Sequence, residues 1–114
     1  MGYPLDFMEK VGRAAQVRGP SYIHCHAPCP TGWGVASAQM VNLARLAVQT
    51  GCVLLYEVND GERKLSKRFG TRPPVQDYLG HQARFRHVMQ DPEALAAIQR
   101  GVDERYEMVS ATML

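Results

Sequence analysis

Residues 19–33 read GPSYIHCHAPCPTGW, and this stretch decides how the rest of the chain is interpreted. Its first part, residues 21–25, is β-prone and predicts a short buried strand. The part that follows is crowded with turn-forming residues and predicts a loop. Cys29 stands in this loop between Pro28 and Pro30, which fix φ and remove two backbone donors. The sequence therefore predicts a thiol on a stiff loop at the carboxyl end of a strand, the edge where α/β sheets bind ligands.

The chemistry that suits such a thiol is iron–sulfur ligation. A cluster needs thiolates on a rigid support, amide donors to sulfur and a dry surround. Gly32 lets the backbone approach closely, and Trp33 is placed to exclude water. From spacing alone the signal is weak, because a cluster takes about four thiolates. The chain has three cysteines and no CxxC pair, so a small buried residue is the commoner role for an isolated Cys29.

The other cysteines and the neighbouring histidines have simpler interpretations. Cys25, within the expected strand, and Cys52, at the start of a second one, are interpreted as core thiols. A zinc site made by His24, His26 and Cys25, close to Cys29, is an alternative. The spacing HCHxxC matches no closed structural zinc pattern, so the alternative is the weaker one.

Working outward, helical periodicity and cap signals define the remaining elements. The turn Asn59-Asp60-Gly61 predicts a hairpin, and Asp91-Pro92 predicts a helix start. Helices are expected at residues 3–17, 37–50, 75–89 and 92–108, and further strands at 52–58 and 63–66.

This order predicts an α/β fold with a short, mostly parallel sheet, flanking helices, a β-hairpin and two C-terminal helices. A parallel sheet needs both faces covered. Two or three strands with these helices are too few for that, so further sequence or a partner is expected to complete the fold. The residues expected to face that missing cover in part are Met40, Leu43, Val48, Tyr78 and Phe85.

Composition narrows the class of protein. The chain has 114 residues, which suits one domain or part of a larger one. A net charge of +2 from 13 basic and 11 acidic side chains favours neither nucleic acid nor an anionic membrane. The sequence lacks an apolar run of about 18 residues and an N-terminal secretory signal. We therefore expect a cytoplasmic protein whose cysteines are reduced thiols or metal ligands.

Two clusters of basic residues could each either bind a ligand or partner or lie in solvent. The first group could meet the phosphates of a ligand or an acidic partner protein, but such a run more often forms a solvated connector. It consists of Lys64, Lys67, Arg68 and Arg72. A second group that could face a partner subunit or solvent consists of Arg84, Arg86 and His87.

GPSYIHCHAPCPTGW resembles a segment of the beta subunits of pyruvate synthases, which are 2-oxoacid:ferredoxin oxidoreductases. LARLAVQTGCVLLYEVNDGERKLS and RPPVQDYLGHQARFRHV are similar to the segments that follow it in that family. The similarity covers roughly residues 3–108, and PCPTGW is its most specific part. Cys25 and His26 depart from the family, where these positions are usually apolar.

The resemblance implies a thiamine pyrophosphate-binding subunit with Mg²⁺ and a proximal [4Fe–4S] cluster. It implies that Cys29 is the fourth cluster ligand, and that the other three cysteines and the Gly-Asp-Gly motif for the diphosphate lie upstream. Neither a CxxC pair nor a Gly-Asp-Gly motif occurs here. We therefore expect the chain to be the C-terminal part of such a subunit, with no catalytic residue of its own.

The implied reaction is oxidative decarboxylation of a 2-oxoacid, with pyruvate the expected substrate, to acyl-coenzyme A, with electrons passed to ferredoxin. The implied partners are the alpha, gamma and delta subunits or an N-terminal beta part. Residues 1–66 are expected to belong to the thiamine pyrophosphate domain, and residues 67–114 to a helical extension that contacts other subunits. The alternative is a non-catalytic metal-binding or interaction remnant of that fold.

Overall fold

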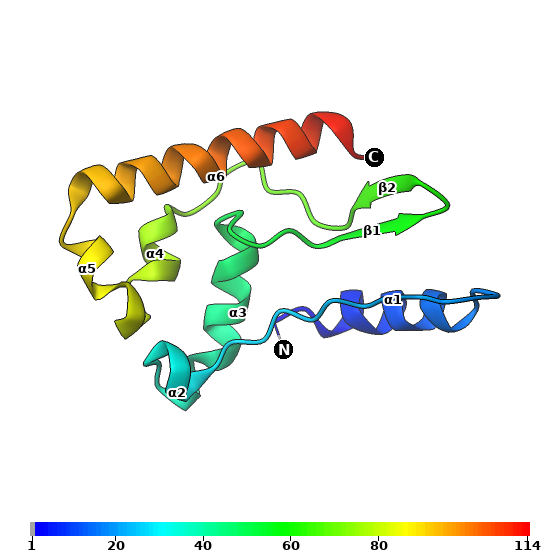
Figure 1. Ribbon diagram of the computed structural model, residues 1–114, viewed down its shortest axis with the longest axis horizontal. Helices are drawn as coiled ribbons and strands as arrows, with labels where there is room; N and C mark the ends of the chain where they lie inside the picture. The colour runs from blue at the N-terminus through cyan, green and yellow to red at the C-terminus, as the bar shows by residue number, and fades with distance from the viewer. Residues whose placement is uncertain (1) are drawn as a thin grey trace.

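The computed structural model describes residues 2–114 and is built mainly from helices, with one short hairpin toward one end (Figure 1). Its elements are α1 (Pro4–Ala15), α2 (Pro30–Trp33), η1 (Ser37–Gln39), α3 (Met40–Gln49), β1 (Tyr56–Asn59), β2 (Glu62–Leu65), α4 (Val75–Leu79), η2 (Ala83–Phe85), α5 (Arg86–Met89) and α6 (Pro92–Thr112). No helix in residues 2–114 has both the length and the apolar character needed to cross a membrane.

The long helix α6 begins where its sequence predicts. The Asp91 side chain accepts hydrogen bonds from the backbone N–H groups of Glu93 and Ala94, at 3.1 and 3.0 Å. These bonds satisfy two donors that a helix start leaves open, and Pro92 follows at the first helical position. Both α4 and α5 pack against α6, and α4 also packs against α3. In Figure 1 the long helix runs along the upper edge, with α3, α4 and α5 below it.

The hairpin confirms the turn prediction. Strands β1 and β2 pair antiparallel, with Asn59 opposite Glu62. Asp60 and Gly61 connect them at φ values of 49° and 83°. Two consecutive positive φ values match the twist of a two-residue hairpin, and Asp and Gly tolerate them well.

The parallel sheet is not seen. In residues 2–114 the sheet consists of the antiparallel pair alone, and residues 21–25 are exposed chain without strand pairing. None of the described residues 20–28 takes part in a backbone–backbone hydrogen bond. A β-prone segment becomes a strand only when another strand satisfies its backbone groups. The expected strand at 21–25 is therefore wrong for this chain on its own.

The predicted helix at 75–89 is also wrong, because it divides into α4, η2 and α5. The break follows Gly80, and the Gln82 side chain there is only 1% exposed. Gln82 donates to the carbonyl of Tyr78 at 2.9 Å. A buried amide that bonds the preceding turn competes with continuation of the helix, and helical periodicity alone does not reveal it.

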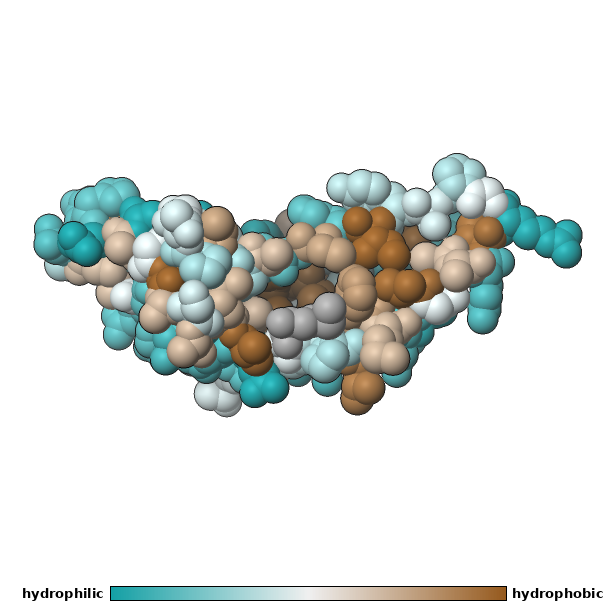
Figure 2. All heavy atoms as spheres, turned by 90° about the horizontal axis from the view of Figure 1, so that it is seen from below, coloured by the Kyte–Doolittle hydropathy of each residue, from teal (hydrophilic) through white to brown (hydrophobic). Residues whose placement is uncertain are grey.

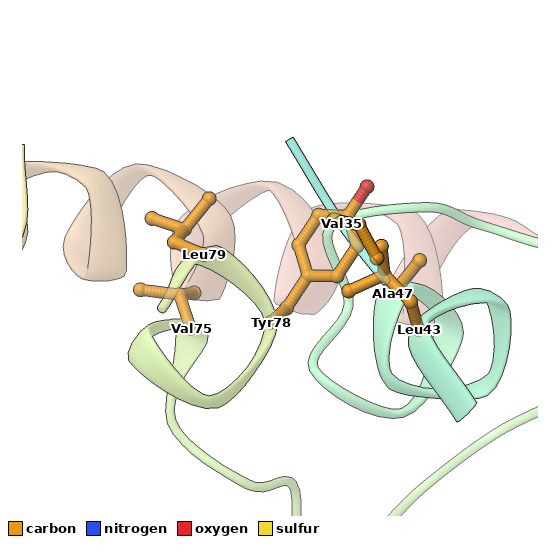
Figure 3. Packing of buried hydrophobic residues seen from close by; sticks show 6 residues of the cluster. All are labelled: Val35, Leu43, Ala47, Val75, Tyr78 and Leu79. Carbon is orange, nitrogen blue, oxygen red and sulfur yellow. The ribbon is translucent and has the colours of Figure 1, made fainter. Parts of the chain in front are cut away.

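The core lies where α3 and α4 meet beneath α6. Figure 3 shows Leu43 and Ala47 of α3 beside Tyr78 of α4, with Val75 and Leu79 further along α4. All five are at most 5% exposed. The core therefore joins residues from both sides of the boundary that the sequence places at residues 66 and 67.

This packing corrects part of the expectation that five apolar side chains face missing sequence or a partner. Leu43, Val48 and Tyr78 are buried within the chain, and Met40 and Phe85 are half-buried. Helix α4 packs against both α3 and α6, so the expectation is wrong for Leu43, Val48 and Tyr78, whereas Met40 and Phe85 keep partly exposed side chains. The exposed apolar surface lies elsewhere.

Helix α1 carries much of that exposed surface. It buries none of its residues, and Leu5 and Met8 are 74% and 66% exposed. Figure 2 shows apolar groups gathered over α1, on the right half of the face seen from below. An ion pair between Arg13 and Glu57, at 2.6 Å, joins α1 to the hairpin. Exposed ion pairs contribute about 1 kcal/mol or less, so α1 is only weakly held.

The whole chain is more open than a compact domain. Its radius of gyration is 15.6 Å, whereas about 13 Å is typical of a compact domain of this length. Its accessible surface is 7718 Å², whereas a compact monomer of 12.7 kDa exposes roughly 6,200 Å². The excess, on the order of 1,500 Å², is at least as large as one partner's share of an ordinary protein interface.

Candidate functional site

The loop that carries Cys29 ends in a single helical turn, α2. Cys29 occupies the N-cap position in an extended conformation, and Pro30 is the first helical residue. The Cys29 sulfur accepts a hydrogen bond from the backbone N–H of Gly32 at 3.3 Å. A side chain at Gly32 would meet this sulfur at 3.2 Å, which is tighter than most such contacts. Glycine thus allows the sulfur to lie over the amide.

The far end of the turn is fixed by Gly34. Its φ of 65° is left-handed, and the N–H of Val35 bonds the carbonyl of Pro30 at 3.0 Å. A side chain at Gly34 would come within 2.5 Å of the Ala83 Cβ. The Ala83 N–H also donates to the Gly34 carbonyl at 3.3 Å. The Cys29 turn is therefore seated against η2.

Replacement of Gly34 by alanine should lower the free energy of unfolding by roughly 2 kcal/mol or more, from left-handed strain and the clash with Ala83. Urea denaturation followed by circular dichroism at low protein concentration measures this loss. Gly70→Ala is the matched control, because no atom outside its chain neighbours lies within 4 Å of the added methyl and its φ is not positive. Equal stability of the two variants would contradict the seating of the turn.

The three cysteines differ in their surroundings. Cys29 and Cys25 are both exposed, and Cys52 is half-buried against the core. Burial raises the pKa of the Cys52 thiol, although a hydrogen bond from Thr50 and two nearby arginines oppose the shift. The interpretation of Cys52 as a core-packing thiol is confirmed, and that of Cys25 is wrong. Cys25 is exposed because the strand expected to bury it does not form.

The arrangement around Cys29 fits one ligand of an iron–sulfur cluster. The sulfur is accessible, stands on a proline-clamped turn, and has an amide donor of the kind that hydrogen-bonds cluster sulfur. Within residues 2–114 no group of three or more His, Cys, Asp and Glu side chains could hold a metal ion. A cluster held by Cys29 therefore needs ligands from outside these residues.

Aromatic and basic side chains line the other side of the turn. The rings of His26 and Trp33 lie 5.6 Å apart, and His26 Nε2 is 3.4 Å from the Tyr78 hydroxyl. Burial lowers the pKa of His26, and the charge of Arg84 adds to this shift. Arg84 itself lies over the Trp33 ring, with its Cζ 3.9 Å from the ring centroid. Arg84 thus lies against the loop, although the residue remains exposed.

The basic connector is largely tied down within the chain. Arg68 donates to the carbonyls of Ser110 and Met113 near the end of α6. Arg72 pairs with Asp103, donates to the Thr50 carbonyl, and stacks on the Tyr106 ring. These two arginines fasten the connector to the helices rather than lie free in solvent. Lys64 and Lys67 remain exposed.

The candidate site is thus the exposed Cys29 thiol, on a turn that packs against η2. No protein-family model matches the chain. Over 103 residues, 90% of its length, it is 50% identical to pyruvate synthase subunit PorB of Methanothermobacter thermautotrophicus. It is 38% identical over 109 residues to the same subunit of Methanocaldococcus jannaschii, and 36% identical over 109 residues to ketoisovalerate oxidoreductase subunit VorB of Pyrococcus horikoshii.

The chain is therefore a homologue of the PorB subunit of pyruvate synthases, which confirms the resemblance seen in the sequence. It spans only about a third of the length of these relatives: 35% and 36% of the two PorB subunits and 34% of VorB.

The sequence did not reveal the buttress behind the turn. Gln82 has no local signal of burial, and the sequence around Arg84 is compatible with a contact to a partner or with solvent. The Arg-Phe-Arg-His stretch was visible as part of the resemblance. Its contact with Trp33 joins positions 51 apart in the chain, and no local pattern encodes such a contact.

Proposed function

We propose that this chain forms part of a 2-oxoacid:ferredoxin oxidoreductase of the pyruvate synthase type, as the C-terminal part of its beta subunit. The observation that carries the proposal is the Cys29 turn, set in a chain homologous to PorB. The assembled enzyme would convert a 2-oxoacid and coenzyme A to acyl-coenzyme A and carbon dioxide and reduce ferredoxin. Pyruvate is the proposed substrate, after the names of the two PorB relatives.

In this proposal Cys29 donates one thiolate to a [4Fe–4S] cluster. The Gly32 amide donates to the same sulfur and holds it in place. Such a donor to a ligand sulfur also tunes the redox potential of a cluster. The remaining ligands come from the rest of the subunit. When bound, thiamine pyrophosphate with Mg²⁺ supplies the carbanion chemistry of decarboxylation and the cluster accepts electrons singly.

In this proposal the exposed surface of the chain contacts the rest of the subunit and other subunits. Residues 1–66 belong to the thiamine pyrophosphate domain, and residues 67–114 form a helical part that contacts other subunits, such as alpha, gamma and delta. The open shape and the bare apolar side of α1 support a role as part of a larger assembly. Large uncovered apolar surfaces are uncommon on monomers and mark interfaces.

Co-expression with the rest of the subunit and its partners, under anaerobic conditions, tests the function. A brown complex with visible absorbance and pyruvate-dependent ferredoxin reduction is the expected result. A stable, colourless monomer that joins no partner would instead favour the alternative of a non-catalytic remnant.

The chain alone should not bind thiamine pyrophosphate with Mg²⁺, because its sequence lacks a Gly-Asp-Gly motif for the diphosphate. Isothermal titration calorimetry measures this directly, with the co-expressed complex as the positive control. Micromolar binding to the chain alone would contradict the proposed division of the subunit.

A further inference from the structure

The side chain of Arg84 lies between two aromatic rings. Its Cζ is 3.9 Å from the centroid of the Trp33 ring and 4.6 Å from that of Phe85. A guanidinium this close to an aromatic face gains both stacking and cation–π attraction. Trp33 is half-buried and is the last residue of α2. The stack therefore joins η2 to the turn that presents Cys29.

A second contact fixes the direction of the guanidinium. Arg84 Nε donates to Gln82 Oε1 at 2.9 Å. Gln82 is almost fully buried, and its amide nitrogen donates to the Tyr78 carbonyl at 2.9 Å. The guanidinium is thus tied through Gln82 to α4, the helix at the centre of the core. Arg84 is exposed, but these contacts fix the position of its guanidinium.

The charge of Arg84 is not neutralised by an ion pair. Among residues 2–114, the carboxylates that form ion pairs do so with Lys10, Arg13 and Arg72. A surface arginine commonly pairs with a carboxylate or extends its charged end into water. Arg84 instead places an unpaired positive charge on the ring of Trp33, four residues after Cys29.

We propose that Arg84 is a positioning residue for the Cys29 turn: stacked on Trp33 and tied to buried Gln82, it holds the turn in the shape that presents the thiolate, and its charge favours the reduced cluster. The part that concerns the cluster rests on the proposed function. A cluster gains negative charge on reduction, and net charge near it sets its potential. Removal of the guanidinium should therefore loosen the turn and lower the potential.

Hydrogen–deuterium exchange on the co-expressed complex tests the positioning. The amides of Gly32, Trp33 and Val35 bond the Cys29 sulfur, the Cys29 carbonyl and the Pro30 carbonyl. In Arg84→Ala they should exchange about fivefold faster, which corresponds to about 1 kcal/mol of lost stacking. Peptides from α6 should be unchanged. Arg86→Ala, a change at an exposed arginine two residues on, is the matched control and should leave the turn as it is.

The conservative variant separates geometry from charge. Arg84→Lys keeps the charge but loses the planar stack and the fixed fork of donors. It should speed exchange in the turn nearly as much as Arg84→Ala. In a potentiometric titration followed by electron paramagnetic resonance, Arg84→Lys should keep the wild-type potential, whereas Arg84→Ala should shift it to a more negative value.

Three results would overturn the inference. Unchanged exchange in Arg84→Ala would show that the stack does not hold the turn. Faster exchange with an unchanged potential would remove the role toward the cluster. A wild-type complex without iron would instead overturn the proposed function itself, and with it any role of Arg84 at a cluster.

Discussion

Cys29→Ala is expected to remove the proximal cluster from the assembled enzyme. The variant takes away the thiolate but leaves the prolines and the turn behind it unchanged. A [4Fe–4S] cluster with one missing ligand is lost or strongly destabilised, since water or hydroxide binds iron far less firmly than thiolate does. The expected result is a large loss of iron per complex and loss of ferredoxin reduction. Iron analysis, visible absorbance and electron paramagnetic resonance of the anaerobically purified complex measure it.

Cys25→Ala is the closest control. Cys25 is a second exposed thiol, four residues before Cys29 on the same segment, but it caps no helical turn. This variant should retain iron and activity. Cys52→Ala should also retain iron, at a modest cost in stability, because that side chain packs against the core. Iron retained in Cys29→Ala, or lost in Cys25→Ala, would show that the ligand assignment is wrong.

The second large effect is expected at α1. Met8→Glu should weaken association with the rest of the beta subunit by about tenfold to a hundredfold, because it replaces apolar burial with a buried charge. The fold of the chain itself should persist, since α1 contributes no buried residue. Pull-down of co-expressed chains and light scattering of the eluted complex measure the association.

The matched control is a methionine on another helix. Met108 of α6 is 61% exposed, close to the 66% of Met8. If α1 is the covered surface, Met108→Glu should leave the complex intact. Equal loss in both variants would point to a general effect of added charge, and no loss in either would remove α1 from the interface.

The free chain offers an independent check on the same surface. It exposes about a quarter more area than a compact monomer of its mass. We expect it to self-associate or to bind a hydrophobic dye, and co-expression should suppress both. A clean monomer with a sharp thermal transition and no dye binding would show that the chain is a complete domain.

Local sequence determined the hairpin turn, the start of α6 and the Cys29 loop. Asn59-Asp60-Gly61 sets the hairpin because these residues tolerate positive φ, and the structure has Asp60 and Gly61 in that region. Asp91 and Pro92 set the start of α6. The Asp91 side chain accepts hydrogen bonds from free N–H groups of the first turn, and Pro92 has no N–H group that would need a partner. The Cys29 loop was recognisable for the same reason, since proline and glycine act on their own backbone. The amino-acid sequence also showed the homology with PorB subunits.

Tertiary contacts decided the rest. The helix expected at 75–89 breaks because buried Gln82 bonds the preceding turn, and the strand expected at 21–25 stays open because no neighbouring strand pairs with it. Arg84 lies over the ring of Trp33, which is 51 residues earlier in the chain. Each outcome depends on a partner that is distant along the chain or lies outside it. Propensity and periodicity describe only what a residue does with its near neighbours, so they could not supply these contacts.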